Sequence, residues 1–244
     1  MDFCLITPKT IHVTKDTKCY IRRKNIAIAP QVEPPPPEPE PGPEPPDDGI
    51  RPPDRDIDFE ALFEINKDIA AWVSLPGTLI DYPVVASKDN YDYLERGFDG
   101  KQNRYGTPFM DMGNSPDFSD RNTVIYGHNM DDGAMFAGLH KFKEIEFFEE
   151  TREIKLYTPE GMRRYEIFAA YITDDRNILF EKDYTNDAVW ELYIKNVFDN
   201  EDAILKPIEI GENDQILTLS TCVKNEFYQR YLVQGLLKKR PASP

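Results

Sequence analysis

The sequence predicts a mainly β fold for most of the chain, and three observations support this. Short runs of β-branched and aromatic residues recur from position 79 onward, with turn residues between them. Few segments show the three- and four-residue apolar spacing of an amphipathic helix. The last two apolar runs are close enough in sequence to pair as a hairpin. Regularly spaced short strands favour a closed barrel or a sandwich over a parallel α/β sheet.

The first 53 residues differ in composition from the rest of the chain. Residues 1–29 show only weak alternation, and no role is assigned to them. Residues 30–53 are dominated by proline and glutamate, which favours an extended, semi-rigid spacer with no apolar surface to bury. Residues 54–244 are then the predicted folded domain, about 190 residues, which is enough for a good core.

The domain is predicted to open with a helix and to continue as strands. Asp56 or Asp58 can cap a helix that ends at Pro76-Gly77. Its apolar positions at helical spacing are Phe59, Leu62, Phe63, Ile65, Ile69 and Trp72. Strands are predicted at residues 80–85, 107–110, 123–126, 153–157 and 165–171, followed by the closing hairpin.

Two further segments have helical spacing. Residues 135–148 carry Phe136, Leu139, Phe142, Ile145 and Phe148 at three- and four-residue steps. Residues 186–198 carry Val189, Leu192, Tyr193 and Val197 in the same way. The second segment precedes the closing hairpin, so it either forms one wall of a groove there or simply covers the sheet.

Composition excludes several classes of protein. The formal net charge of −15 argues against nucleic acid as a partner and against adhesion to anionic lipid. Three cysteines with no CxxC pair make neither a disulfide framework nor a zinc site, and we expect no metal and no cofactor. No apolar stretch approaches the roughly 18 residues of a membrane span, and no signal peptide is recognisable at the start.

The closing hairpin carries the first candidate for chemistry. An apolar run over 216–222 ends on Cys222, and a second run over 230–233 begins with Arg230. If the two runs pair, these residues face each other at about 5 Å between Cα atoms. A lone cysteine is more often a small buried side chain, but a thiol beside a fixed cation favours the reactive thiolate.

One of the three histidines stands out. His12 lies in the unassigned segment, and His140 lies in a predicted helix where a surface or packing role is expected. His128 follows a predicted strand, where catalytic groups are commonly presented. A thiol nucleophile, an imidazole that exchanges protons and a guanidinium that stabilises an oxyanion are the groups that thiol acyl transfer requires.

These residues lie in motifs that resemble the sortase family, specifically class B. The similar segments are Thr218 to Cys222 with Arg230 eight residues later, and Tyr126 to Met130 around the histidine. Residues 65–72, 76–78, 80–85, 106–111 and 122–125 are also similar, as are Met135, Phe136 and Leu139, so that about 180 residues are covered. The long helix before the cysteine strand is a class B trait.

The resemblance implies an eight-stranded β-barrel with an N-terminal helix, and a cysteine transpeptidase. It implies Cys222 as nucleophile, His128 as general acid/base and Arg230 as oxyanion and substrate stabiliser. Substrate-binding positions are expected at Asn90, Leu94, Ile178, Leu179 and Ser220. Such enzymes cut a sorting motif of a surface protein or pilin after threonine, then transfer the thioacyl group to an amine of cell-wall precursor or a pilin lysine.

The family further implies a location at the outer face of the cell membrane or in the cell wall of Gram-positive cells. Its members usually begin with a membrane-spanning segment, which this sequence lacks. Two alternatives to the transpeptidase stay open. One is a thiol protease that hydrolyses the same acyl-enzyme, and the other is a non-catalytic module that binds the wall or a peptide.

Overall fold

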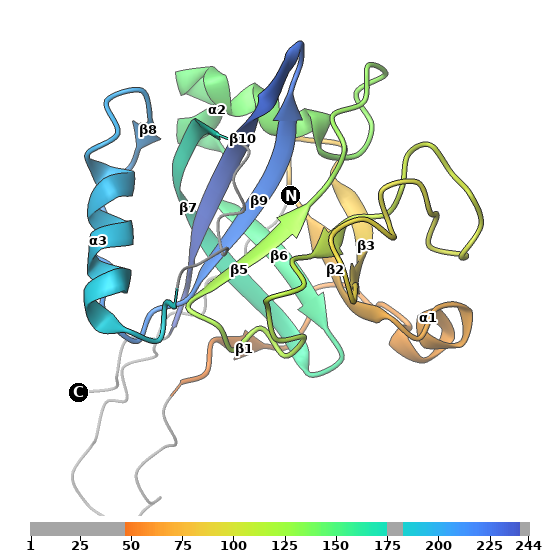
Figure 1. Cartoon of the computed structure of the whole chain (residues 1–244). Helices are drawn as coiled ribbons and strands as arrows, with labels where there is room; N and C mark the ends of the chain where they lie inside the picture. The colour runs from red at the N-terminus through yellow and green to blue at the C-terminus, as the bar shows by residue number, and fades with distance from the viewer. Residues whose placement is uncertain (1–46, 175–182, 240–244) are drawn as a thin grey trace, which may run out of the picture. The chain divides into compact units, whose positions relative to one another are not determined.

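Eight strands close into a barrel in a computed structural model that describes residues 47–174 and 183–239 (Figure 1). Hydrogen-bonded neighbours follow the order β7-β10-β9-β5-β4-β3-β2-β6, and β6 pairs back with β7 to complete the ring. The strands are β2 (Ile69–Ser74), β3 (Asp81–Ala86), β4 (Phe109–Met110), β5 (Asn122–Tyr126), β6 (Glu153–Thr158), β7 (Gly161–Asp174), β9 (Ile216–Val223) and β10 (Glu226–Leu237). The predicted closed barrel is confirmed, and the sandwich alternative is wrong.

The two faces of the barrel wall bury different apolar clusters, because successive side chains on a strand point to opposite sides. On β9, Leu217 and Leu219 point into the barrel core, whereas Ile216 belongs to a second cluster on the outer face. That outer cluster includes Trp190 and Val197 of helix α3 (Asp187–Phe198), which covers one side of the barrel (Figure 1). Ser220 and Cys222 have the same parity as Ile216, so they belong to the outer face.

The N-terminal helix is shorter than the sequence pattern suggests. Helix α1 spans only Phe59–Ile65, and Asp58, not Asp56, caps it by accepting a hydrogen bond from the Ala61 amide at 2.8 Å. Ile69 and Trp72 were predicted to extend this helix, and that prediction is wrong because both lie in β2. Strand β2 pairs with β3 on one side and β6 on the other, and these long-range hydrogen bonds outweigh the local apolar periodicity.

The sheet begins before the predicted boundary at residue 54. Strand β1 (Ile50–Arg51) pairs with Arg163 and Met162 of β7, so the last residues of the predicted spacer already belong to the sheet. A second short strand, β8 (Ile204–Leu205), pairs farther along β7. Residues 1–46, which include most of that spacer, lie outside the described residues.

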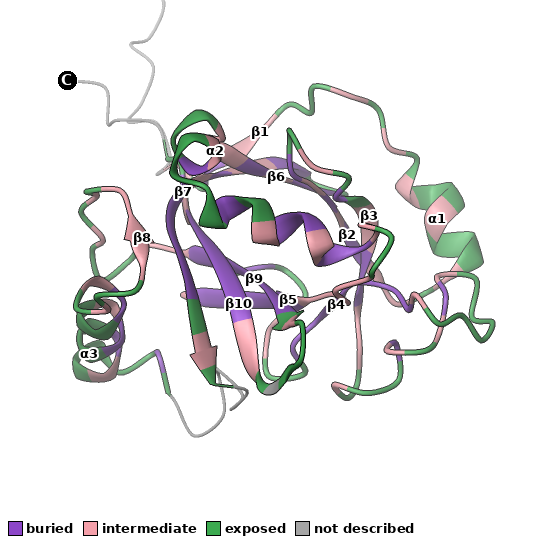
Figure 2. Cartoon of the chain, turned by 90° about the horizontal axis from the view of Figure 1, so that it is seen from above, coloured by how far each residue is buried: buried purple, intermediate pink, exposed green. Residues whose placement is uncertain are grey.

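The helical segment predicted at 135–148 is divided in two. A 3-10 helix, η1 (Phe136–Lys143), is followed by α2 (Ile145–Glu150), with Glu144 extended between them. Figure 2 shows the segment leading into α2 across one end of the barrel, where its buried residues join the core. The predicted helix at 186–198 is confirmed as α3, which begins after Asn186. Within the described ranges, no helix is long and apolar enough to span a membrane.

Candidate active site

Strand register brings the three residues singled out in the sequence to one edge of the barrel. Strand β5 runs parallel to β9, with Tyr126 opposite Ser220. His128 and Cys222 each follow two residues later, so the ends of these parallel strands carry them to the same place. On the other side of β9, antiparallel β10 places Arg230 directly opposite Cys222. The cysteine strand is therefore flanked by the strand leading to the histidine and by the strand bearing the arginine.

A cleft of about 260 Å³ opens at this edge. Cys222 is exposed there as a free thiol, while His128 and Arg230 are half-buried. The residues that line the cleft are Asn90, Tyr91, Tyr93, Leu94, Thr107, Phe109, Tyr126, Gly127, His128, Ser220, Thr221, Cys222 and Arg230. This set contains six of the eight positions expected from the sequence. The other two, Ile178 and Leu179, lie outside the described residues.

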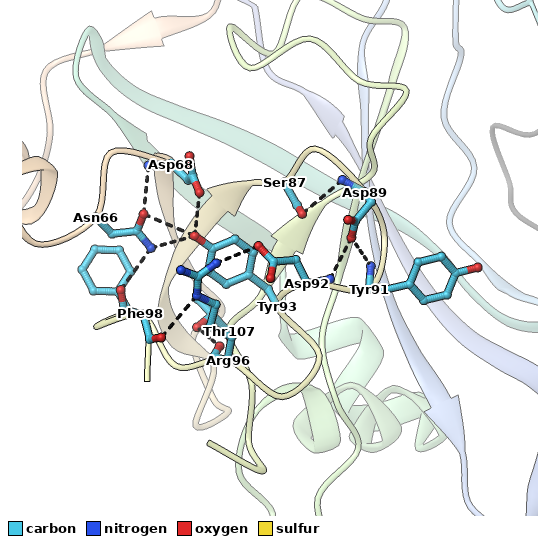
Figure 3. Close-up of polar contacts among 11 residues, drawn as sticks. Asn66, Asp68, Ser87, Asp89, Tyr91, Asp92, Tyr93, Arg96, Phe98 and Thr107 are labelled. Carbon is cyan, nitrogen blue, oxygen red and sulfur yellow. Dashed lines mark hydrogen bonds and ion pairs between the residues drawn. The ribbon is translucent and has the colours of Figure 1, made fainter. Parts of the chain in front are cut away.

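The long connection between β3 and β4 forms one wall of the cleft, and polar contacts hold it in place (Figure 3). The Tyr93 hydroxyl donates to Asp68 at 2.7 Å and accepts from the Asn66 amide at 2.9 Å. Backbone amides of Tyr91 and Asp92 both donate to Asp89 at 2.8 Å. Burial raises the pKa of Tyr93, so its phenol remains a neutral donor near neutral pH.

This wall reaches the histidine through the backbone of Leu94. The Nε2 atom of His128 lies 2.7 Å from the Leu94 carbonyl oxygen. Because a carbonyl can only accept, the hydrogen-bond network assigns a proton to Nε2. The imidazole is thus held by the wall in one tautomer, and Nδ1 is the nitrogen left for proton exchange.

The backbone around His128 is also tied to the cysteine strand. The Gly127 amide donates to the Ser220 carbonyl at 3.0 Å, and the Thr221 hydroxyl donates to the Gly127 carbonyl at 2.7 Å. From the other side, the Phe136 amide of η1 donates to the His128 carbonyl at 2.8 Å. These three bonds fix the strand end from which the imidazole projects.

A buried carboxylate organises the far side of the cleft. Asp111, only 2% exposed, accepts from the Tyr126 hydroxyl at 2.7 Å and from the Asn90 amide at 3.1 Å. Burial, followed by the charge of Asp111 and this hydrogen bond, raises the pKa of Tyr126 well above its usual value. The nearby Arg230 charge acts in the opposite direction, which places the guanidinium within electrostatic reach of the tyrosine.

The sequence prediction missed several residues around this site. Asp111 and Tyr126 were not singled out as site residues, although Tyr126 lies on the same face as Ser220. Asn129 and His140 were also missed, and both approach the backbone carbonyl of Cys222 at 3.0 Å. His140 was expected to serve only on the surface or in packing. The neighbours of His140 depend on where η1 packs against the barrel, and this cannot be predicted from the spacing of residues in the motifs.

Chemically, the cleft offers an accessible thiol, an imidazole in a fixed tautomer and a permanent cation. Together these groups can attack a carbonyl carbon, deliver a proton to a departing amine and stabilise a developing oxyanion. The walls combine aromatic and apolar side chains with about as many polar ones, and such a mixture can bind a peptide through both its side chains and its backbone.

Comparison with known proteins agrees with this geometry. The sortase domain family matches residues 73–238, more than half of the chain. Sortase B of Staphylococcus aureus is 34% identical over 164 residues, which are 67% of each chain. Sortase B of Listeria monocytogenes is 35% identical over 180 residues, which are 72% of each chain.

Solved structures give the same result. The crystal structure of sortase B from Clostridium perfringens superposes with a TM-score of 0.68 at 32% identity, covering 75% of this chain and 100% of that one. A substrate complex of Staphylococcus aureus sortase B superposes with a TM-score of 0.67 at 32% identity, covering 75% of this chain and 85% of that one. The chain therefore belongs to the sortase family, as a class B sortase.

Proposed function

We propose that this class B sortase, a transpeptidase of the cell wall, works through a thioacyl-enzyme formed on Cys222. The observation that carries the proposal is the common cleft of Cys222, His128 and Arg230, each delivered by a different chain segment at one barrel edge. The proposed substrate is a surface protein or pilin that bears a sorting motif. A substrate complex of the sortase B from Staphylococcus aureus supports substrate binding by this fold.

In the first step, the Cys222 thiolate attacks the carbonyl carbon of the threonine in the sorting motif. A C–S bond forms and the carbonyl oxygen becomes an oxyanion, which the Arg230 guanidinium stabilises with fixed N–H donors. The C–N bond then breaks as His128 gives to the departing amine the proton that its Nδ1 took from the Cys222 thiol when the thiolate formed. The contact between Nε2 and Leu94 supports this assignment, because it leaves Nδ1 as the exchangeable position.

In the second step, an acceptor amine attacks the thioester carbonyl. The new C–N bond forms, the C–S bond breaks, and His128 takes the proton that the amine loses. The proposed acceptor is an amine of cell-wall precursor or a pilin lysine, so the enzyme acts at the outer face of the membrane or in the wall. If water took the place of the amine, the same residues would make a thiol protease.

The substrate peptide is proposed to lie along Asn90, Leu94 and Ser220, which line the cleft beside the three catalytic groups. Asn90 supports this role because Asp111 and the Met112 amide fix both ends of its side-chain amide, at 3.1 and 2.9 Å. Ile178 and Leu179 remain candidates for the same role outside the described residues.

The test incubates the full chain with a panel of sorting-motif peptides, with and without oligoglycine, and follows products by mass spectrometry. We expect a thioacyl adduct on Cys222 and a ligated product in the presence of amine. Cys222→Ala should abolish turnover without changing the melting temperature, while a Cys4→Ala, Cys19→Ala double variant should keep activity. Free acid as the only product at saturating amine would favour the protease. Turnover by Cys222→Ala would refute both the transpeptidase and the protease that depend on this thiol, whereas a wild type that forms neither adduct nor product would favour the non-catalytic module.

A further inference from the structure

The backbone carbonyl of Cys222 lies just beyond the end of the β5–β9 ladder. Strand β5 ends at Tyr126, and the Gly127 amide still donates to the Ser220 carbonyl. Two residues later, the Cys222 carbonyl is contacted by two side chains instead of backbone. The Asn129 amide nitrogen and the His140 Nε2 each lie 3.0 Å from its oxygen.

The proton positions at this carbonyl follow from hydrogen-bond chemistry. The Asn129 nitrogen and His140 Nε2 are also 3.1 Å apart, a hydrogen-bonding distance at which Nε2 could accept if it carried no proton. The contact of Nε2 with the Cys222 carbonyl decides between the two tautomers, because that oxygen can only accept. A carbonyl oxygen has two lone pairs and can accept from both. Nε2 of His140 therefore carries the proton. Its Nδ1 is buried without a partner among the described residues, so a second proton there would find no acceptor among them.

His140 is neutral for a second reason. Burial lowers its pKa, and the nearby Lys143 charge acts in the same direction, although the contact with the Cys222 carbonyl opposes both. The imidazole ring also packs on Tyr231 of β10, with ring centroids 5.0 Å apart, and Tyr231 is only 3% exposed. His140 is thus a neutral donor held on a buried platform.

Asn129 connects this carbonyl to the proposed acid/base. It is the residue after His128, and it forms an isolated β-bridge with Met135 at the start of η1. The amide of Phe136, the next residue, donates to the His128 carbonyl. The histidine loop, the cysteine strand and η1 therefore meet at a single point, the carbonyl of Cys222.

We propose that Asn129 and His140 are positioning residues for the acyl transfer, which they support by fixing the peptide plane that follows Cys222. Holding this carbonyl sets the backbone torsion of the nucleophile and the distance between its strand and the His128 loop. The inference rests on the proposed function, since it concerns the separation of thiol and imidazole. Misplacement of reacting groups by about 1 Å can cost about 100-fold in rate.

The carbonyl lies at an exposed strand end, so water can replace a lost donor there. Removing one donor should therefore leave the peptide plane after Cys222 less well fixed, while the free energy of unfolding changes little. We expect kcat to fall and KM to stay nearly unchanged. His140→Phe keeps the ring on Tyr231 but removes the donor. His140→Gln keeps a side-chain N–H donor with similar reach.

The experiment measures kcat, KM and the melting temperature for these two variants, for Asn129→Ala and for Lys143→Ala. Lys143 is the matched control, because it lies on η1 and over the Tyr231 ring at 5.4 Å. Its charge is the smallest of the three influences on the pKa of His140, and its removal leaves both donors to the Cys222 carbonyl in place. We expect kcat to fall about 10- to 100-fold in His140→Phe and Asn129→Ala, with KM nearly unchanged. His140→Gln should recover most of the rate, and Lys143→Ala should match the wild type.

The inference is overturned if His140→Phe turns over like the wild type, or if His140→Gln is as slow as His140→Phe at equal melting temperature. If His140→Phe is unfolded, Asn129→Ala decides in the same way, and wild-type kcat in that variant overturns the proposal. Cys222→Ala is assayed in parallel. Activity in that variant refutes the proposed function itself, whereas an inactive Cys222→Ala beside a fully active His140→Phe refutes only the positioning role.

Discussion

Gly127 joins the end of β5 to His128 at a point with no room for a side chain. A Cβ atom placed there would lie 2.5, 2.7 and 2.8 Å from the Cγ, Cδ2 and Cδ1 atoms of the Phe136 ring. Carbon atoms in contact normally stay about 3.5 to 4.0 Å apart, so the overlap is about 1 Å. Phe136 is fully buried in the core and cannot swing away.

Gly127→Ala should therefore move the backbone on one or both sides of the contact. Overpacking of this kind costs about 1 to 3 kcal/mol. For a domain of this size that lowers Tm by roughly 2 to 12 °C. Since the Phe136 amide donates to the His128 carbonyl at 2.8 Å, the shift also displaces the proposed acid/base. We expect kcat for amide transfer to fall about 10- to 100-fold.

The assay pairs thermal unfolding with steady-state transpeptidation. Gly211→Ala is the matched control, because its added Cβ would meet Asp214 at an ordinary 3.6 Å and its φ is not in the left-handed region. Phe136→Leu replaces the ring by a smaller side chain and makes room for the added Cβ. Combined with Gly127→Ala, it should restore part of the rate. Wild-type Tm and kcat in the Gly127→Ala variant would refute the steric reasoning.

Three further predictions concern single side chains. Arg230→Lys keeps the charge but loses the planar fork of donors, so kcat should fall about 100-fold at unchanged Tm, and a wild-type rate would remove Arg230 from oxyanion stabilisation. Tyr126→Phe removes one hydrogen-bond donor from the buried Asp111 carboxylate and should lower the free energy of unfolding in urea by about 1.5 to 3 kcal/mol. An unchanged urea midpoint would contradict this. Because the pKa of His140 is lowered in the folded state, the unfolded chain binds the proton more readily. The free energy of unfolding should therefore fall as pH drops below about 6.5, and His140→Gln should gain stability relative to the wild type between pH 8 and pH 5.

The sequence by itself determines the local features of this protein. Asn186 marks the start of α3, where its side chain accepts from the Ala188 amide at 3.0 Å. The two apolar runs around Cys222 and Arg230 are separated by a short polar loop. Pairing of two runs so close in sequence therefore costs little loop-closure entropy. The direct opposition of Cys222 and Arg230 additionally depends on an irregularity of β10 between Glu226 and Arg230, which the apolar pattern does not predict.

Only the tertiary structure decided the features that depend on distant pairing. Residues Ile69 to Ser74 became a strand because β3 and β6 offer hydrogen bonds on both sides, while the local pattern favoured a helix. His128 reached Cys222 through the parallel pairing of β5 with β9, across about 90 residues of chain. The same packing brought His140 of η1 to the Cys222 carbonyl. Apolar periodicity records which face of an element is buried, whereas the partner that buries it is set only when the barrel closes.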